Sequence, residues 1–154
     1  MHPLHGDDVD HVLIVGDGIG GLAAAAVLSR VVPRVALIER AERPTEIGAA
    51  LALQPNGMAV LDQLGLLAPL LDVGTRIERM DIRSASGTIL ATGRMPDLGD
   101  ELDYAVAVRR TDLHRLLLDT ITSTKRVHTR FGCTAVSADP AGAVIIKARA
   151  DQVS

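Results

Sequence analysis

The residues best suited to chemistry are a cluster of glycines near the N-terminus and an acidic residue that follows them. Gly16-Asp17-Gly18-Ile19-Gly20-Gly21 lies between an apolar run at 12–15 and an alanine-rich stretch. The first glycine permits a tight turn, the second lets a phosphate approach the backbone, and the last lets a helix pack closely on a sheet. The free N–H groups and the dipole at a helix start favour an anion there. The spacing predicts a dinucleotide phosphate site with candidate residues Gly16, Gly18, Gly20 and Gly21.

The elements around these glycines must hold them in place. Residues 12–15 are apolar and partly β-branched, which is typical of a strand buried on both faces. Residues 22–30 follow as a helix whose expected apolar face carries Ala24, Val27, Leu28 and Val31, and Pro33 stops it. A second apolar run at 35–38 completes a strand, glycine turn, helix and strand, which is the order of a dinucleotide-binding βαβ unit.

Glu39 stands at the expected carboxyl end of the second strand, where its carboxylate can accept hydrogen bonds from both ribose hydroxyls. Arg40 follows it and belongs to the same candidate site. Asp17 is an unusual residue for a phosphate loop, where small neutral side chains are common. If its carboxylate faces the phosphates it repels them, and if it points away it costs little.

Composition narrows the classes of protein. The chain has 154 residues, 47% of them hydrophobic, and a net charge of −3 with no basic cluster, which argues against nucleic acid as a partner. The single cysteine, Cys133, excludes an internal disulfide, and no apolar run is long enough to span a membrane. We expect a cytoplasmic protein with a mobile leader at 1–10 and one domain at 11–154. His2, His5 and His11 lie in or beside the acidic leader, and no metal site is expected there.

The middle of the chain alternates short strands and helices. We expect a strand at 48–53, a helix from Pro55 capped by Gly65, and an apolar stretch at 66–71. Alternating residues at 76–92 predict a hairpin with Gly87 at its turn, followed by a loop at 93–103.

A second helix is expected after a short strand at 105–108. Thr111 is its predicted cap, and Leu113, Leu116, Leu117 and Ile121 line its apolar face. His114 falls outside that stripe and is expected in solvent. Three further strands are expected at 127–131, 134–137 and 143–150.

Several segments together resemble a known family. They are Val15 to Leu22, Glu39-Arg40, Gly48 to Asn56, Leu61 to Leu66 and Arg110-Thr111-Asp112-Leu113. In this order they are similar to the N-terminal portion of the single-component FAD-dependent aromatic hydroxylases, the para-hydroxybenzoate hydroxylase-like monooxygenases. The combination of Pro55-Asn56 with Arg110 is more specific than the glycine motif alone. Ala50 stands where the family commonly has glycine.

The resemblance implies an α/β fold, a Rossmann-like FAD-binding domain whose parallel sheet carries an added β-meander. It implies that the glycine loop holds the FAD pyrophosphate, that Glu39 holds the adenosine ribose, and that Arg110 lies near the ribityl and phosphate region. An arginine keeps its charge and can fork onto phosphate or hydroxyls. Arg109 occupies a position that other residue types hold more often in the family.

The activity implied is NAD(P)H-driven hydroxylation of a small aromatic or polyketide-like substrate, for which FAD supplies the chemistry. No residue presents itself as a catalytic acid or base. Family members are more than twice as long, so we expect a truncated domain that is inactive alone. The neighbour on one side of the first strand is then missing, and self-association through the exposed sheet edge is expected.

Other functions fit these residues less well. The main alternative is a nucleotide-binding module or remnant without catalysis. An NAD-dependent dehydrogenase is disfavoured because Glu39 leads into the Pro55-Asn56 helix and not into another βαβ repeat. Disulfide reductases need a cysteine pair, and this chain has a single cysteine. Amine oxidases usually carry a Gly-Gly-Arg motif soon after the ribose-binding acid, and residues 43–48 lack this motif. The sequence leaves open the substrate and the choice between NADH and NADPH.

Overall fold

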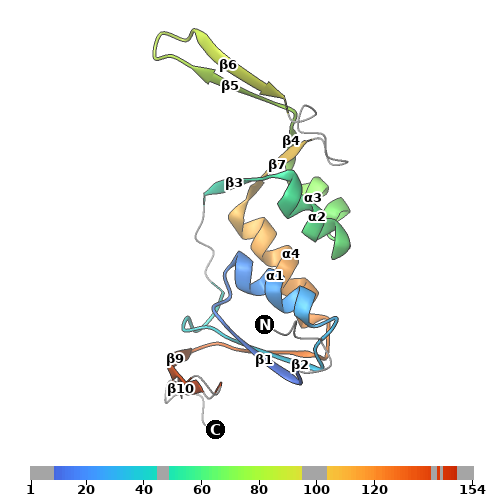
Figure 1. Cartoon of the computed structure of the whole chain (residues 1–154), viewed down its shortest axis with the longest axis vertical. Coiled ribbons are helices and arrows are strands. Elements are labelled where there is room, and N and C mark those ends of the chain that lie inside the picture. Colours follow the sequence, from blue (N-terminus) through green and yellow to red (C-terminus); the bar gives the residue numbers. More distant parts are fainter. Residues whose placement is uncertain (1–8, 45–48, 95–103, 140–141, 143, 149–154) are drawn as a thin grey trace, which may run out of the picture. The chain divides into compact units, whose positions relative to one another are not determined.

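A computed structural model describes residues 9–44, 49–94, 104–139, 142 and 144–148. The chain forms two compact units, Met1–Glu46 with Leu117–Ser154, and Ile47–Leu116. Both units combine helices and strands, which confirms the predicted α/β class (Figure 1). His2, His5 and most of the predicted leader lie outside the described residues. In the part of the chain that is described, no helix is long and apolar enough to cross a membrane.

The first unit is built on a parallel sheet of β1 (His11–Val15), β2 (Arg34–Ile38) and β8 (Val127–Arg130), in the order β1-β2-β8. Val12 pairs with Val35, and Val35 in turn pairs with Val127. Helix α1 (Ile19–Leu28) connects β1 to β2, so the predicted βαβ unit is confirmed. β9 (Cys133–Ala138) and β10 (Val144–Ala148) form an antiparallel hairpin after the sheet.

The buried face of α1 differs from the predicted one. The structure buries Leu22, Ala25 and Ala26, whereas Val27 and Val31 are 43% and 61% exposed. Helix α1 lies closest to the sheet at Gly21. The residues one turn further along on the same side of the helix therefore face the sheet and are buried. Val31 lies beyond the end of the helix and takes no part in its face.

Strand β1 is less buried than its composition predicted. Its side chains are intermediate or exposed, and Val15 is 61% exposed. The reason is positional, because among the described residues β1 pairs only with β2 and forms the edge of its sheet. The strand predicted at 127–131 is confirmed as β8, which pairs with β2 on the side away from β1.

The second unit has a small antiparallel sheet of β3 (Ala50–Leu53), β7 (Ala105–Arg109) and β4 (Thr75–Ile77), in the order β3-β7-β4. Two helices lie between β3 and β4 in the chain, α2 (Pro55–Gln63) and α3 (Leu67–Val73). Helix α3 was expected only as an apolar stretch at 66–71, and it contains Pro69. This proline is the third residue of the helix, where its missing N–H has no intrahelical partner to lose.

A separate hairpin of β5 (Arg79–Arg83) and β6 (Ile89–Arg94) confirms the predicted turn, with Gly87 at φ +89° (Figure 1). Asp81 accepts hydrogen bonds from Arg79 and from the Thr92 hydroxyl of the opposite strand, at 2.8 Å each. β6 continues through Arg94, so the loop predicted from residue 93 begins later than expected, and residues 95–103 lie outside the described residues.

Helix α4 (Arg110–Thr122) begins two residues earlier than a helix capped by Thr111 would, so Thr111 is inside the helix and is not its cap. β7 passes directly into α4, and the backbone N–H of Arg110 donates to the carbonyl of Ala49, 3.2 Å away. The prediction that His114 is solvated is wrong, since its exposed fraction is 9%. His114 lies three residues before Leu117 on the helix, which places it beside the buried stripe.

Candidate functional site

The glycine turn joins β1 to α1 and is held by its own backbone. Gly16 has φ +103°, a conformation that side chains disfavour, and its N–H donates to the carbonyl of Ile38 at 2.8 Å. A Cβ placed on Gly21 would collide with the Gly16 carbonyl oxygen. The turn therefore requires glycine at both positions, and it brings the start of α1 against the end of β1.

The first turn of α1 presents backbone donors without a side-chain cap. Gly18 is the N-cap residue, and the first helical hydrogen bond runs from the N–H of Leu22 to the Gly18 carbonyl, 2.9 Å. The N–H groups of residues 19–21 precede that bond and have no partner within the helix. A Cβ on Gly20 would meet no atom within 4 Å, so protein packing does not require glycine at this position. Such a helix start suits a phosphate anion.

Glu39 is fixed at the carboxyl end of β2 by backbone donors on both carboxylate oxygens. Its Oε1 accepts from the N–H of Ala41 at 2.8 Å, and its Oε2 accepts from the N–H of Asp17 at 3.1 Å. Its main chain is held equally well, because its N–H donates to Arg130 and its carbonyl accepts from Cys133. The carboxylate is thus anchored directly beside the glycine turn.

Electrostatics favour the ionised form of this carboxylate. Partial burial alone would raise the pKa of Glu39, but the donated hydrogen bonds of Ala41 and Asp17 outweigh it and hold the pKa below its ordinary value of 4.5. Asp17 is only 7% exposed, and its backbone N–H is one of the two donors that hold the Glu39 carboxylate.

A cavity of about 290 Å³ opens at this place. It is lined by Val15, Gly16, Ile38, Glu39, Arg40, Cys133, Thr134 and Ala135. Its size is at the low end for small-molecule sites and suits part of a dinucleotide more than the whole. Sequence reasoning did not place Cys133 or Thr134 here, and no motif signals them. They arrive because β9 follows β8 across the end of β2.

The predicted site residues fall in both units. Gly16, Gly18, Gly20, Gly21, Glu39 and Arg40 belong to the first unit, and the structure brings the glycine turn, Glu39 and Arg40 together. Arg110 belongs to the second unit, where it is the first residue of α4.

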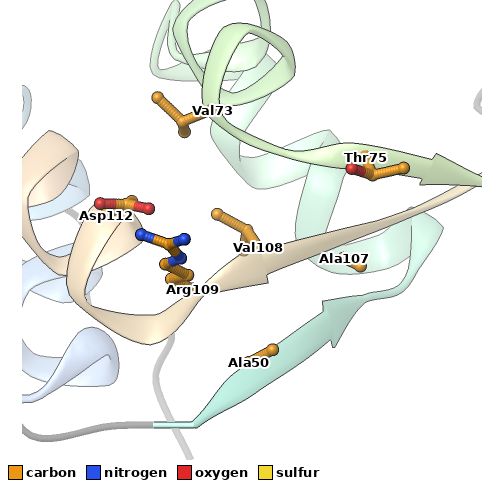
Figure 2. Close-up of a pocket in the computed structure, with 7 residues that line it drawn as sticks. All are labelled: Ala50, Val73, Thr75, Ala107, Val108, Arg109 and Asp112. Carbon is orange, nitrogen blue, oxygen red and sulfur yellow. The ribbon is translucent and has the colours of Figure 1, made fainter.

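The second unit has a cavity of its own, of about 500 Å³ (Figure 2). In the β-sheet register Ala50 lies opposite Arg109, and Thr75 lies opposite Ala107, so these four side chains share one face. Figure 2 shows the Arg109 guanidinium and the Asp112 carboxylate turned toward each other at one end. A floor of small side chains with a cation and an anion at its edge can receive a flat, partly polar ligand.

Comparison with known proteins decides the family. A protein-family model described as "FAD binding domain" matches residues 10–153 of this chain. The chain belongs to the FAD binding domain family. One relative is the 3-amino-4-hydroxybenzoate 2-monooxygenase of Streptomyces cremeus, 38% identical over 109 residues, which cover 69% of this chain and 28% of that enzyme. Another is 3-hydroxybenzoate 6-hydroxylase 1 of Aquipseudomonas alcaligenes, 32% identical over 133 residues, covering 82% and 33%.

A solved structure shows the same fold. The p-nitrophenol 4-monooxygenase PnpA from Pseudomonas putida DLL-E4 superposes with a TM-score of 0.78 at 20% identity, covering 90% of this chain and 39% of that one. The chain thus spans roughly a third of the length of these relatives. The family resemblance predicted from the sequence is confirmed, and so is FAD as the family's cofactor.

The first unit of this FAD binding domain fits the adenosine end of its cofactor on structural grounds. Gly21 packs so close to the Gly16 carbonyl that a side chain there would displace the start of α1 from the glycine turn. The N–H groups at the start of α1 can receive a pyrophosphate, and Glu39 offers anchored acceptor oxygens to hydroxyl donors. These donor and acceptor types match the groups along the adenosine diphosphate portion of FAD.

Proposed function

We propose that this chain is the FAD-binding portion of a flavin-dependent monooxygenase that hydroxylates a small aromatic substrate with NAD(P)H as the electron donor. The observation that carries the proposal is the anchored Glu39 carboxylate beside a glycine turn that tolerates no side chain at Gly21. Two relatives named for hydroxybenzoate chemistry support the substrate class.

Each candidate residue has a separate task in this proposal. The turn from Gly16 to Gly21 receives the pyrophosphate on backbone N–H groups, and Glu39 accepts the hydroxyls of the adenosine ribose. Arg40 lines the cavity and offers a cation at its rim. Arg110, on the second unit, binds the ribityl or phosphate region, as a forked guanidinium can. When bound, FAD supplies the electron transfer and oxygen chemistry, and the protein supplies binding and orientation.

The test of this assignment is a titration of the purified chain with FAD and, separately, with NADH. Glu39→Ala should weaken FAD binding by roughly 1–3 kcal/mol, about 5- to 150-fold, because ribose hydroxyls lose a charged acceptor. The matched control is Glu42→Ala, which removes the same charge from an exposed position three residues along the chain. Tighter binding of NADH than of FAD, or equal affinity for FAD in both variants, would contradict the proposal.

Arg110 is tested by the same titration. Arg110→Ala should weaken FAD binding, and Arg110→Lys should restore only part of the loss, because lysine keeps the charge but not the forked donors. Arg115→Ala is the control, since it removes a guanidinium from an exposed position on the same helix. Equal affinities in the Arg110→Ala and Arg115→Ala variants would remove Arg110 from the site.

Two further expectations stay predictions. A cytoplasmic location is supported by the single cysteine, Cys133, which excludes an intrachain disulfide. Self-association through the sheet edge is supported by the position of β1, which pairs on one side only within the described residues.

A further inference from the structure

The first unit has another cavity, of about 520 Å³, beside the β9–β10 hairpin. We call it the Arg40–Lys147 cavity, and its lining residues are Arg40, Ala41, Gly132, Thr134, Lys147 and Ala148. It adjoins the smaller cavity at Glu39, because Arg40 and Thr134 line both. The two cavities differ in charge. The smaller one contains an anchored carboxylate, whereas the described residues around the larger one include two cations and no acid.

The backbone on both sides of Arg40 is fastened to the start of β9. The Glu39 carbonyl accepts a hydrogen bond from the N–H of Cys133 at 2.8 Å. The Ala41 carbonyl accepts one from the N–H of Gly132, also at 2.8 Å. These two N–H groups are therefore used within the fold, and side chains are left to bind a ligand in the cavity.

The β9–β10 hairpin brings the second cation to the same place. In its antiparallel register Lys147 lies directly opposite Thr134, so their side chains share one face of the hairpin. Thr134 also lies two residues beyond Gly132, which is tied to the segment that carries Arg40. Two strands and the segment after β2 therefore converge on one cavity with a guanidinium, an ammonium and a hydroxyl group.

The two cations are not neutralised by the protein. Through its side chain, neither Arg40 nor Lys147 forms an ion pair or a hydrogen bond with any residue in the described ranges. Glu39 precedes Arg40 in the chain, but its carboxylate oxygens accept from the backbone N–H groups of Ala41 and Asp17. A chain whose net charge is −3 thus keeps two cations available at one cavity.

A phosphate group matches this set of donors. A guanidinium can direct two N–H groups at two phosphate oxygens, an ammonium adds a point charge, and the Thr134 hydroxyl can donate to a third oxygen. Two positive charges balance a phosphate dianion, whereas a carboxylate offers a single charge. The volume of about 520 Å³ lies within the range of about 300–1,000 Å³ for small-molecule sites, so an organic group attached to the phosphate also fits.

We propose that the Arg40–Lys147 cavity binds a phosphate dianion, either free phosphate or the phosphate monoester of a small molecule. Binding at this site requires no FAD. One consequence does rest on the proposed function. Since Arg40 lines both cavities, a phosphate that engages Arg40 withdraws a cation from the rim of the adenosine site and lowers the affinity for FAD.

The first test uses the fact that the chain has two lysines, Lys125 and Lys147. Carbon-13 NMR of the intact chain, labelled at lysine, follows both while inorganic phosphate is added at about pH 8, where the dianion predominates. We expect a saturable shift of Lys147 and none of Lys125, which is exposed between α4 and β8. Equal shifts of the two lysines, or the same shift of Lys147 in chloride of equal ionic strength, would overturn the proposal.

The second test measures phosphate affinity in variants by phosphorus-31 NMR. Arg40→Ala and Lys147→Ala should each weaken binding about three- to tenfold, because each removes a charge-assisted hydrogen bond at a partly screened position. Arg43→Ala and Lys125→Ala are the matched controls, since they remove the same charges from exposed positions that do not line the cavity. Circular dichroism checks that all four variants fold. Equal losses in the cavity variants and the controls would overturn the proposal.

The source of the phosphate is identified by comparing inorganic phosphate with glycerol 3-phosphate. Tighter binding of the ester shows that the site takes a phosphate monoester, and equal binding shows that it takes free phosphate. Either result supports the phosphate site. Failure of both to bind the wild-type chain at up to about 10 mM would overturn it.

FAD titration then separates this inference from the proposed function. Saturating phosphate should lower FAD affinity about two- to fivefold, the scale of one exposed charge, and Lys147→Ala should need more phosphate for the same effect. Unchanged FAD affinity would overturn the coupling through Arg40. A chain that binds phosphate at Lys147 but no FAD would support the phosphate site and refute the proposed function. A chain with Glu39-dependent FAD binding and no response of Lys147 to phosphate would do the reverse.

Discussion

Replacing Gly21 with alanine tests the closest contact of the glycine turn. A Cβ at this position would collide with the Gly16 carbonyl oxygen and would lie 3.2 Å from the carbonyl carbon. Neither atom belongs to a flexible side chain. Gly16 is also tied to Ile38 by its N–H and occupies a left-handed conformation, so the turn cannot move aside cheaply. The start of α1 must shift away from β1 instead.

The size of the effect follows from two opposing contributions. Overpacking of this kind costs about 1–3 kcal/mol, and the upper half of that range applies because both partners are backbone. Alanine returns about 0.5–1 kcal/mol through its better helix propensity and smaller unfolded-state entropy. The net loss for Gly21→Ala is then about 2 kcal/mol, or roughly 4–8 °C in Tm for a chain of this length.

Gly20→Ala is the matched control because it adds the same methyl group one residue earlier in the same helix turn. An added Cβ at Gly20 meets no protein atom within 4 Å. The variant should gain about 0.5–1 kcal/mol of stability, since only the helix-propensity contribution remains. A loss of FAD affinity in this more stable variant would show that the pyrophosphate passes directly over Gly20.

The assay combines thermal unfolding, followed by circular dichroism, with FAD titration of each variant. We expect Gly21→Ala to lower both Tm and FAD affinity, the latter by at least about tenfold, because a displaced helix start no longer directs its N–H groups at one point. Wild-type stability and affinity in Gly21→Ala, or equal destabilisation in Gly20→Ala, would refute the reasoning.

Three further predictions concern the rest of the chain. Gly74→Ala should destabilise the second unit by about 1–3 kcal/mol, measured by urea unfolding, because its Cβ would collide with the Val106 side chain; no loss would contradict the packing. The pKa of Asp81 is lowered to about 2 by hydrogen bonds from Arg79 and then Thr92, so its contribution to hairpin stability is complete above its ordinary 3.8 and disappears as the pH falls toward about 2. An NMR titration of Asp81 with a midpoint near 3.8 would exclude that contribution. The edge of β1 should produce dimers or larger species in sedimentation velocity, and a monomer at all concentrations would rule this out.

Local rules were enough to predict the elements that carry the candidate site. The glycine spacing, the apolar runs and the acid at the end of the second run predicted the βαβ unit, and the structure confirms its parallel register. Gly87 likewise predicted the hairpin turn, because glycine readily adopts the positive φ angle that such a turn needs. These features depend on conformations and periodicities within a few neighbouring residues, so the amino-acid order determines them directly.

Tertiary structure decided the features that depend on what lies opposite a residue. The buried face of α1 was set by the contact of Gly21 with β1, and the burial of His114 and the start of α4 were set by packing and by pairing with β3. Asp17 and Glu39 are 22 residues apart, and no local pattern pairs them. They meet because parallel neighbouring strands end at the same edge of a sheet, which brings together residues that are far apart in the sequence.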